Sequence, residues 1–516
     1  MRKIERIWSV CMAAVLLFGV CAPYGSAAGA GQTYYVDAAA GSDLNGGRSP
    51  ADAWATLAKV GETAFLPGDV VLLKRGGVYT GSVSLGGSGT AENPITLGAY
   101  GSGAAPLLTV GSDQTVLTLL DQSHWIIRDL EITAPAGNAI LVRFRNKTVE
   151  NILIENVVMH DVKNRPSPTY YSGSNAALRI MGSAAVYGAH IENVTVRNCE
   201  IYDAGYGVFT GGNYPNRPAA PYNRNIVVEG CSLHDIYDDA FIMADTDTII
   251  LRDSSVIKTC QSDGLYPTAP VWMWGVNRGL VERCEFAGSK NKRDGMTVDF
   301  DAHTMNSVYQ YVYSHDNVRF MTNCPAGDDY RRANTVRYCL SVNDNVLDSG
   351  GAFYQSPETD LLFYNNTLVN CGDLRFKNYD RATIMNNIFY MKTACSVSFS
   401  PERSYRLGNN CYYNTYTPMF DLASLNRNPG FAGSDFSDKN SFALRLDSPC
   451  NRAGATLGNM GNVDFFGNPT GRVHSVGCFD ADIGEPLPPG PPQTSGWPAL
   501  AALLARLVTL VRSLSE

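Results

Sequence analysis

The segment MTVDFD, which begins at Met296, carries two carboxylates two residues apart, Asp299 and Asp301. Alternate residues of a β-strand share one face. If Val298 and Phe300 point inward, both carboxylates therefore point outward, roughly 7 Å apart along the strand. Two such carboxylates repel each other, so a bound cation, a raised pKa or nearby cationic side chains would compensate. A solvated strand face with alternating charge is the simpler interpretation.

Segments with the same alternating pattern supply further polar side chains. They include AFIMAD from Ala240, VWMWG from Val271, GAFYQS from Gly351 and DLRFKN from Asp373. We align them as parallel strands about 4.8 Å apart. The expected neighbours of the two carboxylates are Asp245 on one side, Tyr354, Arg375 and Lys377 farther along, and Asp294 and His303 in the flanking loops.

Trp272 and Trp274 alternate with Met273, so both indoles share one face of their strand. Facing inward, they would belong to the core. Facing outward, they would form a flat platform on which a sugar ring can stack. The pattern leaves both interpretations open. The candidate substrate-binding residues are Trp274, Tyr354, Arg375 and His303.

A repeat through the middle of the chain must position these strands. An alternating apolar frame recurs, for example as ILIENVVM at Ile152, VTVRNCEI at Val194, IVVEGCSL at Ile226 and LLFYNNTL at Leu361. Its anchor positions lie 21 to 32 residues apart, at Asn198, Gly230, Asp253, Arg283, Tyr311, Tyr338, Asn365, Asn386 and Asn409. A repeat of this length with period-2 alternation predicts an all-β solenoid, in which each coil completes its core against its neighbours.

The residue after the anchor is a cysteine in four coils, namely Cys199, Cys231, Cys284 and Cys339. A ladder of disulfides or metal ligands is one interpretation. We favour a stack of buried thiols that act as small hydrophobic groups. The anchor Asn side chains are predicted to satisfy backbone groups at a corner of each coil. We interpret SHDN at Ser314 as a corner motif rather than as the site of a catalytic histidine.

The N-terminal residues 1–28 are predicted to form a secretion signal, because basic residues precede an apolar run and small residues follow it. The protein is therefore expected to be extracellular. The formal net charge of −8 becomes about −10 without this basic segment, which argues against nucleic acid as a partner. Eleven cysteines then remain, and this odd number argues against a disulfide framework, although Cys450 and Cys478 could pair.

Residues 33–110 differ from the repeat. They begin with TYYVDAAAGSDLNGG, are expected to form a short capping helix around Pro50–Val60, and continue through PGDVVLLKRGG and NPITLGAYG. With DSPCNRAGATLGNMGNVDFFGNPTGRVHSVGCFD from Asp447, this series resembles secreted bacterial right-handed parallel β-helix proteins of the pectate-lyase-like superfamily. The resemblance covers residues 32–480 and implies that fold, with an extracellular polysaccharide as partner. It is less specific for the reaction, because the superfamily holds lyases, hydrolases, epimerases and non-catalytic members.

Within that superfamily, the polar residues are closest in type to those of family-9 polysaccharide lyases. This resemblance implies cation-assisted β-elimination of an acidic polysaccharide, with Ca²⁺ held by Asp245, Asp299 and Asp301 and with Lys377 as the base. The alternative is a glycoside hydrolase in which Asp299 and Asp301 are the two catalytic carboxylates. A non-catalytic polysaccharide-binding or surface protein is a third hypothesis. The ordered motifs of polygalacturonases are absent, and Asp238–Asp239 in YDDAF does not restore them.

The predicted organisation has four parts. The signal (1–28) is followed by the β-helix domain (32–480), a Pro/Gly-rich linker (481–496) and an amphipathic helix (497–516). This last helix is too short and too interrupted by arginine to span a membrane. We expect it to pack on a protein or cell-envelope partner, or to fold back on the β-helix.

Overall fold

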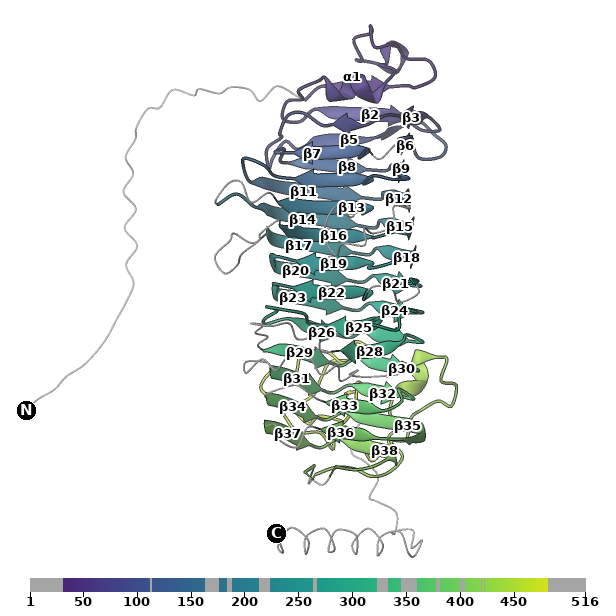
Figure 1. Ribbon diagram of the computed structural model, residues 1–516, viewed down its shortest axis with the longest axis vertical. Coiled ribbons are helices and arrows are strands. Elements are labelled where there is room, and N and C mark those ends of the chain that lie inside the picture. Colours follow the sequence, from purple (N-terminus) through teal and green to yellow (C-terminus); the bar gives the residue numbers. More distant parts are fainter. Residues whose placement is uncertain are drawn as a thin grey trace, which may run out of the picture.

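Three faces of parallel strands wind around one long core (Figure 1). The computed structural model describes residues 31–111, 114–162, 176–182, 188–212, 223–262, 267–322, 333–344, 360–376, 381–399, 404–418, 420–421 and 423–480 of the 516-residue chain. Successive strands along the chain pass from one face to the next, and every strand pairs in parallel with its equivalent in the neighbouring coil. The described residues therefore form the predicted parallel β-helix.

Sheet 1 has fourteen strands. In spatial order they are β1 (Thr33–Val36), β2 (Val70–Lys74), β5 (Ile95–Tyr100), β8 (Trp125–Arg128), β11 (Val149–Glu155), β14 (Ile191–Arg197), β17 (Asn223–Glu229), β20 (Thr246–Arg252), β23 (Asn277–Glu282), β26 (Val308–Gln310), β29 (Asn334–Arg337), β31 (Asp360–Tyr364), β34 (Arg381–Met385) and β37 (Ser404–Gly408).

Sheet 2 follows sheet 1 in each coil and has thirteen strands. They are β3 (Val78–Thr80), β6 (Leu107–Thr109), β9 (Glu131–Thr133), β12 (Val158–Val162), β15 (Glu200–Ala204), β18 (Ser232–Ile236), β21 (Ser255–Ile257), β24 (Glu285–Ala287), β27 (Tyr313–His315), β30 (Leu340–Val342), β32 (Thr367–Val369), β35 (Ile388–Cys395) and β38 (Cys411–Thr415).

Sheet 3 completes each coil, and in the described residues it consists of three blocks. The first block is β4 (Val83–Ser84), β7 (Leu117–Leu120), β10 (Ile140–Arg143), β13 (Leu178–Gly182), β16 (Val208–Gly212), β19 (Phe241–Ala244) and β22 (Val271–Trp274). The second pairs β25 (Met296–Asp299) with β28 (Arg319–Thr322), and the third pairs β33 (Leu374–Phe376) with β36 (Val397–Phe399).

The predicted anchor positions turn the chain from sheet 1 to sheet 2, and we call this column the anchor corner. All nine anchors have a positive φ, between 50° and 61°. Asn and Gly adopt this left-handed conformation readily, which explains why they recur in the column. The predicted backbone bonding is also present: Asn386 Nδ2 donates to the carbonyl of Ala455, and Asn409 Nδ2 donates to that of Ala453. The prediction of a structural corner is confirmed.

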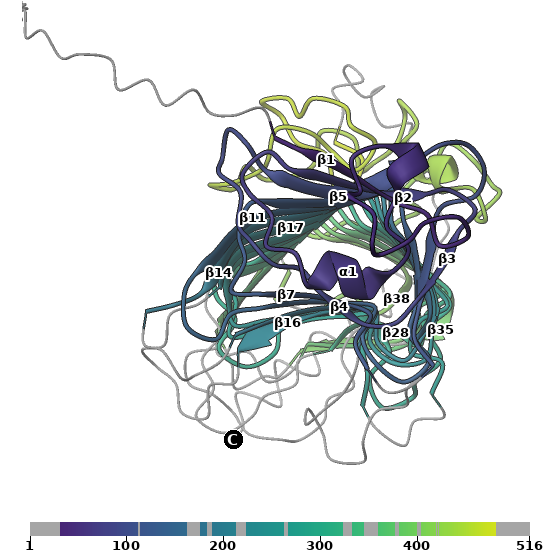
Figure 2. The same ribbon diagram turned by 90° about the horizontal axis from the view of Figure 1, so that it is seen from above.

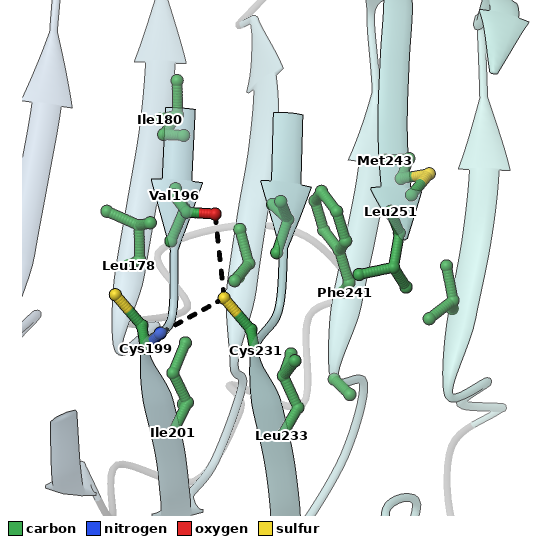
Figure 3. Close-up of a cluster of buried hydrophobic side chains, with 14 of the residues drawn as sticks. Leu178, Ile180, Val196, Cys199, Ile201, Cys231, Leu233, Phe241, Met243 and Leu251 are labelled. Atoms are coloured by element: carbon green, nitrogen blue, oxygen red, sulfur yellow. Dashed lines mark hydrogen bonds between the residues drawn. The ribbon is translucent and has the colours of Figure 1, made fainter. Parts of the chain in front are cut away.

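The column after the anchor lies inside the core. Figure 3 shows Cys199 and Cys231 among aliphatic side chains, with the Cys231 thiol 3.4 Å from the Cys199 amide nitrogen. The nine cysteines whose side chains the structure describes are free and buried, so the four ladder cysteines are small core groups and form no disulfides. Cys450 and Cys478 do not pair either. In the last coils, buried asparagines take over this column, at Asn366, Asn387 and Asn410.

The N-terminal end differs from the single helix expected around Pro50–Val60. A 3₁₀ turn, η1 (Pro50–Asp52), precedes a five-residue helix, α1 (Leu57–Gly61). They are separate because the buried Trp54 forms a parallel bridge with Val36 and is extended rather than helical. Figure 2 shows α1 across the end of the stack, where its Leu57 and Val60 join the core.

Residues 423–480, which we call the C-terminal wrap, fold back along the anchor corner (Figure 1). The wrap contains one short 3₁₀ helix, η2 (Lys439–Phe442). Its Asp480 accepts a hydrogen bond from the Tyr338 hydroxyl at 2.9 Å, and the amide of Cys478 donates to Thr367 at 3.0 Å. Within the described ranges, no helix has the length and apolar character needed to cross a membrane. The predicted signal, linker and C-terminal helix lie outside the described residues.

Candidate active site

The outer face of sheet 3 carries the carboxylates that the sequence analysis selected. Val298 and Phe300 are buried in the main core. A parallel bridge joins Phe300 to Met273, which is also in the core. By this register, Asp299 lies beside Trp272 and Asp301 beside Trp274 on the opposite, outward face. The strand thus has the orientation that the alternation predicted.

Burial distinguishes the two carboxylates. Asp299 is only 4% exposed, whereas Asp301 is half-buried. Asp301 Oδ1 accepts a hydrogen bond from the amide of Ala302 at 2.8 Å, which directs this carboxylate toward the end of the strand. Asp299 is therefore the more desolvated of the two groups.

The two tryptophans resolve the choice that the sequence left open, because Met273 between them is fully buried in the core and both indoles lie outward. Their ring centroids are 6.2 Å apart at an interplanar angle of 60°. Trp272 is 5% exposed and Trp274 is half-buried. Trp274 is thus the indole that presents more surface to solvent.

An apolar group surrounds these rings, and we call it the outer aromatic cluster. Its members are Ala176, Phe209, Ile242, Ala269, Trp272 and Met296, with Tyr206, Ala244 and Trp274 packed against them. Toward the N-terminal end, the Arg179 guanidinium lies 5.3 Å from the centre of the Phe209 ring. Burial and the neighbouring Arg143 lower the pKa of Arg179 to about 10. Aromatic surface bordered by charged side chains is the composition expected of a site that binds sugar rings.

Asp239 is the residue that sequence reasoning undervalued. It follows β18 at the corner that leads into β19, is 5% exposed, and accepts a hydrogen bond from the amide of Ala269 at 2.8 Å. Burial, with the neighbouring carboxylates of Asp238 and Asp294, raises the pKa of Asp239 well above its ordinary value of 3.8. A hydrogen bond with the Trp272 side chain acts in the opposite direction on this pKa but is outweighed. The consecutive acids in YDDAF were visible in the sequence, but their burial was not.

Asp239 and Asp299 therefore flank the same indole. Asp239 contacts the Trp272 side chain from the preceding coil, and Asp299 lies beside Trp272 in the following coil. The loop before Asp299 is held by Arg319, which donates to the carbonyls of Lys292 and Asp294 at 2.7 Å each and also to that of Arg293. A buried carboxyl with a raised pKa, a second carboxylate and an aromatic surface thus come from three successive coils.

The other predicted site residues are less closely grouped. Asp245 lies at a left-handed corner with a φ of 55°, one position beyond Ala244, and it is Ala244 that aligns with Trp274. The sequence alignment of Asp245 with the carboxylate column was therefore wrong by one residue. Arg375 is exposed, three coils from Asp299 and so about 14 Å away, and its guanidinium lies 3.6 Å from Asp373. His303 is half-buried in the loop after Asp301.

Lys377 and Tyr354 lie outside the described residues. Among the residues that the structure does describe, no three His, Cys, Asp or Glu side chains are arranged to hold a metal ion. The predicted ligand set of Asp245, Asp299 and Asp301 is therefore not assembled as one group, and Ca²⁺ stays a prediction.

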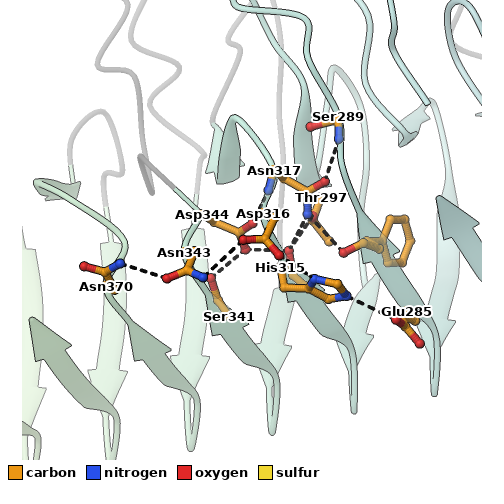
Figure 4. A network of polar contacts seen from close by, with 12 residues as sticks. Glu285, Ser289, Thr297, His315, Asp316, Asn317, Ser341, Asn343, Asp344 and Asn370 are labelled. Carbon is orange, nitrogen blue, oxygen red and sulfur yellow. Dashed lines mark hydrogen bonds and ion pairs between the residues drawn. The ribbon is translucent and has the colours of Figure 1, made fainter. Parts of the chain in front are cut away.

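A second polar network surrounds the SHDN motif (Figure 4). Ser314 and Ser341 donate to the buried carboxylate of Asp344 at 2.6 and 2.7 Å, and the amide of Asn317 donates to it at 2.9 Å. On the outer side, His315 bridges Asp316 and Glu285, at 2.9 and 3.1 Å. These contacts join neighbouring coils, as expected for a structural motif at the corner after sheet 2.

Comparisons with known proteins agree with this architecture. Residues 115–268 match the family model described as "Right handed beta helix region", which supplies the handedness. A curated lacto-N-biosidase of Bifidobacterium longum subsp. longum is 23% identical over 74% of this chain and 30% of its own length. The chain thus spans less than a third of that relative.

Solved structures show the same fold. A GH136 lacto-N-biosidase from Eubacterium ramulus has a TM-score of 0.55 and 20% identity, over 74% of this chain and 67% of its own. XylC, solved in complex with xylose, has a TM-score of 0.52 and 9% identity, over 88% of this chain and 99% of its own. At these identities the likeness concerns the fold, and the chemistry has to be argued from the site itself.

Proposed function

We propose that this protein is a glycoside hydrolase that cleaves an oligosaccharide with two carboxylates on the outer face of sheet 3. This proposal adopts the alternative from the sequence analysis in place of the polysaccharide lyase. The name of the curated relative, a lacto-N-biosidase, supports hydrolysis. The observation that carries the proposal is the position of two buried carboxyls, Asp239 and Asp299, on either side of the Trp272 indole. Burial also raises the pKa of Asp239.

Asp239 is the proposed general acid. A buried carboxyl with a raised pKa keeps its proton at neutral pH and can give it to the glycosidic oxygen as the bond breaks. The same physical cause acts in other sites where one carboxyl must stay neutral, namely removal from water together with nearby negative charge. The acids at Asp238 and Asp294 supply that charge here.

Asp299 is the proposed second carboxylate. Ionised, it either attacks the anomeric carbon directly or activates a water molecule on the opposite face of the sugar. The indole of Trp274 and the rest of the outer aromatic cluster offer the surface on which the ring is oriented. Asp301 is the alternative partner, because it lies on the same face two residues along the strand.

The expected elimination reaction receives less support. It assigns the base to Lys377, which lies outside the described residues, and the cation to a ligand group that the described residues do not assemble. If a cation takes part in the reaction, we propose that it is Ca²⁺ bound by Asp299 and Asp301. We also propose that the protein acts outside the cell, on the basis of the basic and apolar segment at residues 1–28.

The test uses the full chain and the p-nitrophenyl β-glycoside of lacto-N-biose, together with a panel of neutral and acidic oligosaccharides, with Ca²⁺ and with chelator. Release of p-nitrophenol and new reducing ends without unsaturated products is the expected result. Asp239→Asn and Asp299→Asn should each abolish it, with Asp245→Asn as the matched comparison. Chelator-sensitive formation of unsaturated products would instead establish the lyase. Binding without turnover on every compound would leave a recognition protein.

A further inference from the structure

Two cavities lie where the C-terminal wrap leaves the anchor corner. The first has a volume of about 610 Å³ and the second about 630 Å³, and both are lined by Glu285 and Tyr313. Their other walls come from the outer side of sheet 2 and from the wrap. They are therefore separate from the outer aromatic cluster, which belongs to sheet 3.

The floor of the first cavity is a column of polar side chains on the outer face of sheet 2. Ser232, Ser255, Glu285 and Tyr313 are paired in register across four successive strands of sheet 2, so their side chains recur about every 4.8 Å. The anchor-corner residues Gly230, Asp253, Arg283 and Tyr311 run parallel to this column and line the same cavity. Hydroxyl, carboxylate and guanidinium groups at this spacing can exchange hydrogen bonds with the successive hydroxyls of a sugar.

The wall of the first cavity is aromatic. Phe465 and Phe466 of the wrap are half-buried and meet edge to face, with centroids 5.0 Å apart at 87°. The Tyr313 ring lies 6.5 Å from Phe465, and the Lys439 ammonium lies 5.9 Å from the Tyr313 ring centre. Apolar ring surface beside a polar floor matches the two kinds of surface that a pyranose presents.

The charges of the two cavities select the kind of sugar. In the first, the lining carboxylates of Asp253 and Glu285 equal in number the lining cations of Arg283 and Lys439. Arg283 is paired with Asp253 at 2.7 and 3.0 Å and with Glu282 at 2.8 Å. The second is lined by the carboxylates of Glu285, Asp316 and Asp435, and its lining residues include His315 but no lysine or arginine. His315, which bridges Asp316 and Glu285, can offset only one of these three charges. A uronate would therefore meet net negative charge there, whereas a neutral sugar would not be repelled.

We infer that these adjoining cavities form a second glycan-binding site, which takes a neutral oligosaccharide with one ring against Phe465 and Phe466. The site does not depend on hydrolysis at sheet 3. It would hold a glycan chain at a distance from the carboxylates, and so would raise the local concentration of substrate.

The test measures binding by isothermal titration with lacto-N-biose, cellobiose and xylobiose as neutral probes and digalacturonate as the acidic probe. The Asp239→Asn protein is used so that turnover does not interfere. Ser255→Tyr fills the floor of the first cavity. Val158→Tyr introduces the same ring at an earlier position of the same sheet 2 column, outside both cavities. Asn440→Trp narrows the first cavity from the exposed side of the wrap.

We expect at least one neutral probe to bind. Ser255→Tyr and Asn440→Trp should each raise its dissociation constant at least tenfold, whereas Val158→Tyr should leave this constant within twofold. Hydrolysis of the small chromogenic glycoside should be unchanged in Ser255→Tyr. The inference is overturned if no neutral probe binds, if all three variants bind as the parent does, or if digalacturonate binds as tightly as the neutral sugars. Failure of hydrolysis in the unsubstituted protein would reject the proposed function and leave this result intact.

Discussion

The anchor corner between sheets 1 and 2 and the outer face of sheet 3 differ in how far their side chains repeat from coil to coil. The anchor corner repeats one left-handed conformation in all nine anchors. Along the outward column of sheet 3, by contrast, the residue type changes at nearly every coil, from Arg179 through Phe209 and Ile242 to Trp272 and Asp299. Repetition marks the parts that hold the coils together, and its loss marks the part available for chemistry.

The same chemical change in the two regions should therefore have different consequences. Asp239→Asn on the sheet 3 side should lower kcat/KM by about 10³-fold, because it removes the proposed proton donor. Asp253→Asn at the anchor corner should leave kcat/KM for the small chromogenic glycoside within twofold, since Asp253 pairs with Arg283 and lies outside the sheet 3 site.

The pH profile adds a second readout. Because the pKa of Asp239 is raised, this carboxyl should keep its proton at low pH and lose it as the pH rises through its pKa. Activity should fall over the same pH range, because the proposed acid is then ionised. In Asp239→Asn this fall in activity at high pH should be absent. Full activity in Asp239→Asn would show that Asp239 is not the proton donor.

Removing a repeated interior group should affect stability rather than catalysis. Asn387 donates to the carbonyl of Phe363 at 3.0 Å, and its Oδ1 accepts the amide of Asn366 at 3.0 Å. Asn387→Ala removes these partners from the Phe363 carbonyl and the Asn366 amide, which are buried. The free energy of unfolding should therefore fall by about 3 kcal/mol. Denaturant titration measures this change. Asn462→Ala, on an exposed position of the wrap, is the control and should change it by less than about 0.5 kcal/mol.

The interior network at Asp344 should make stability depend on pH. Burial raises the pKa of Asp344 to about 6, from an ordinary 3.8. The folded state therefore holds this proton more tightly than the unfolded state does. The resulting contribution of Asp344 to the free energy of unfolding is fully present below about pH 4 and is lost as the pH rises to about 6. The loss should be at most about 3 kcal/mol, since one pKa unit corresponds to about 1.4 kcal/mol.

Melting temperatures between pH 4 and 7 check this expectation. Asp344→Asn keeps an acceptor for the Asn317 amide but cannot ionise, and so should be less dependent on pH than the unsubstituted protein. Parallel curves for the two proteins would contradict the expectation.

The aromatic surface of sheet 3 should contribute to binding more than to folding. Trp274 is half-buried and packs at the margin of the outer aromatic cluster. Trp274→Ala should raise KM about tenfold, the value of one lost stacking contact with a sugar ring, and leave kcat within about threefold. Equal loss in kcat and kcat/KM, with KM unchanged, would instead place the indole in the transition-state contacts.

The sequence was most informative where local periodicity decides the structure. It identified the nine corner residues, the inward Val298 and Phe300, and the core cysteines, because each follows from position within a coil. It did not identify Asp239, since the pKa of this carboxyl is raised mainly by burial, which depends on other coils, and then by the charges of Asp238 and Asp294.

Two other errors have physical causes. Asp245 was misplaced because a corner residue interrupts the two-residue alternation. The C-terminal wrap was not anticipated as a cover over the anchor corner, because it has no repeat and its contacts are far apart in sequence. Tyr338 and Asp480, for example, are separated by 142 residues.

The position of Asp480 also determines how the molecule carries mechanical load. This residue ends the wrap and is held by the Tyr338 hydroxyl, by His474 and by the amide of Ser475. A force transmitted to Asp480 reaches the coil of Tyr338, three coils before the last one in sequence, and not the end of the stack. The coils of Asn365, Asn386 and Asn409 lie beneath the wrap and bear little tension until it peels away. The wrap thus holds the last coils together along one side of the stack. Force that enters at Asp480 would act across the stack instead of unwinding it from its last coil.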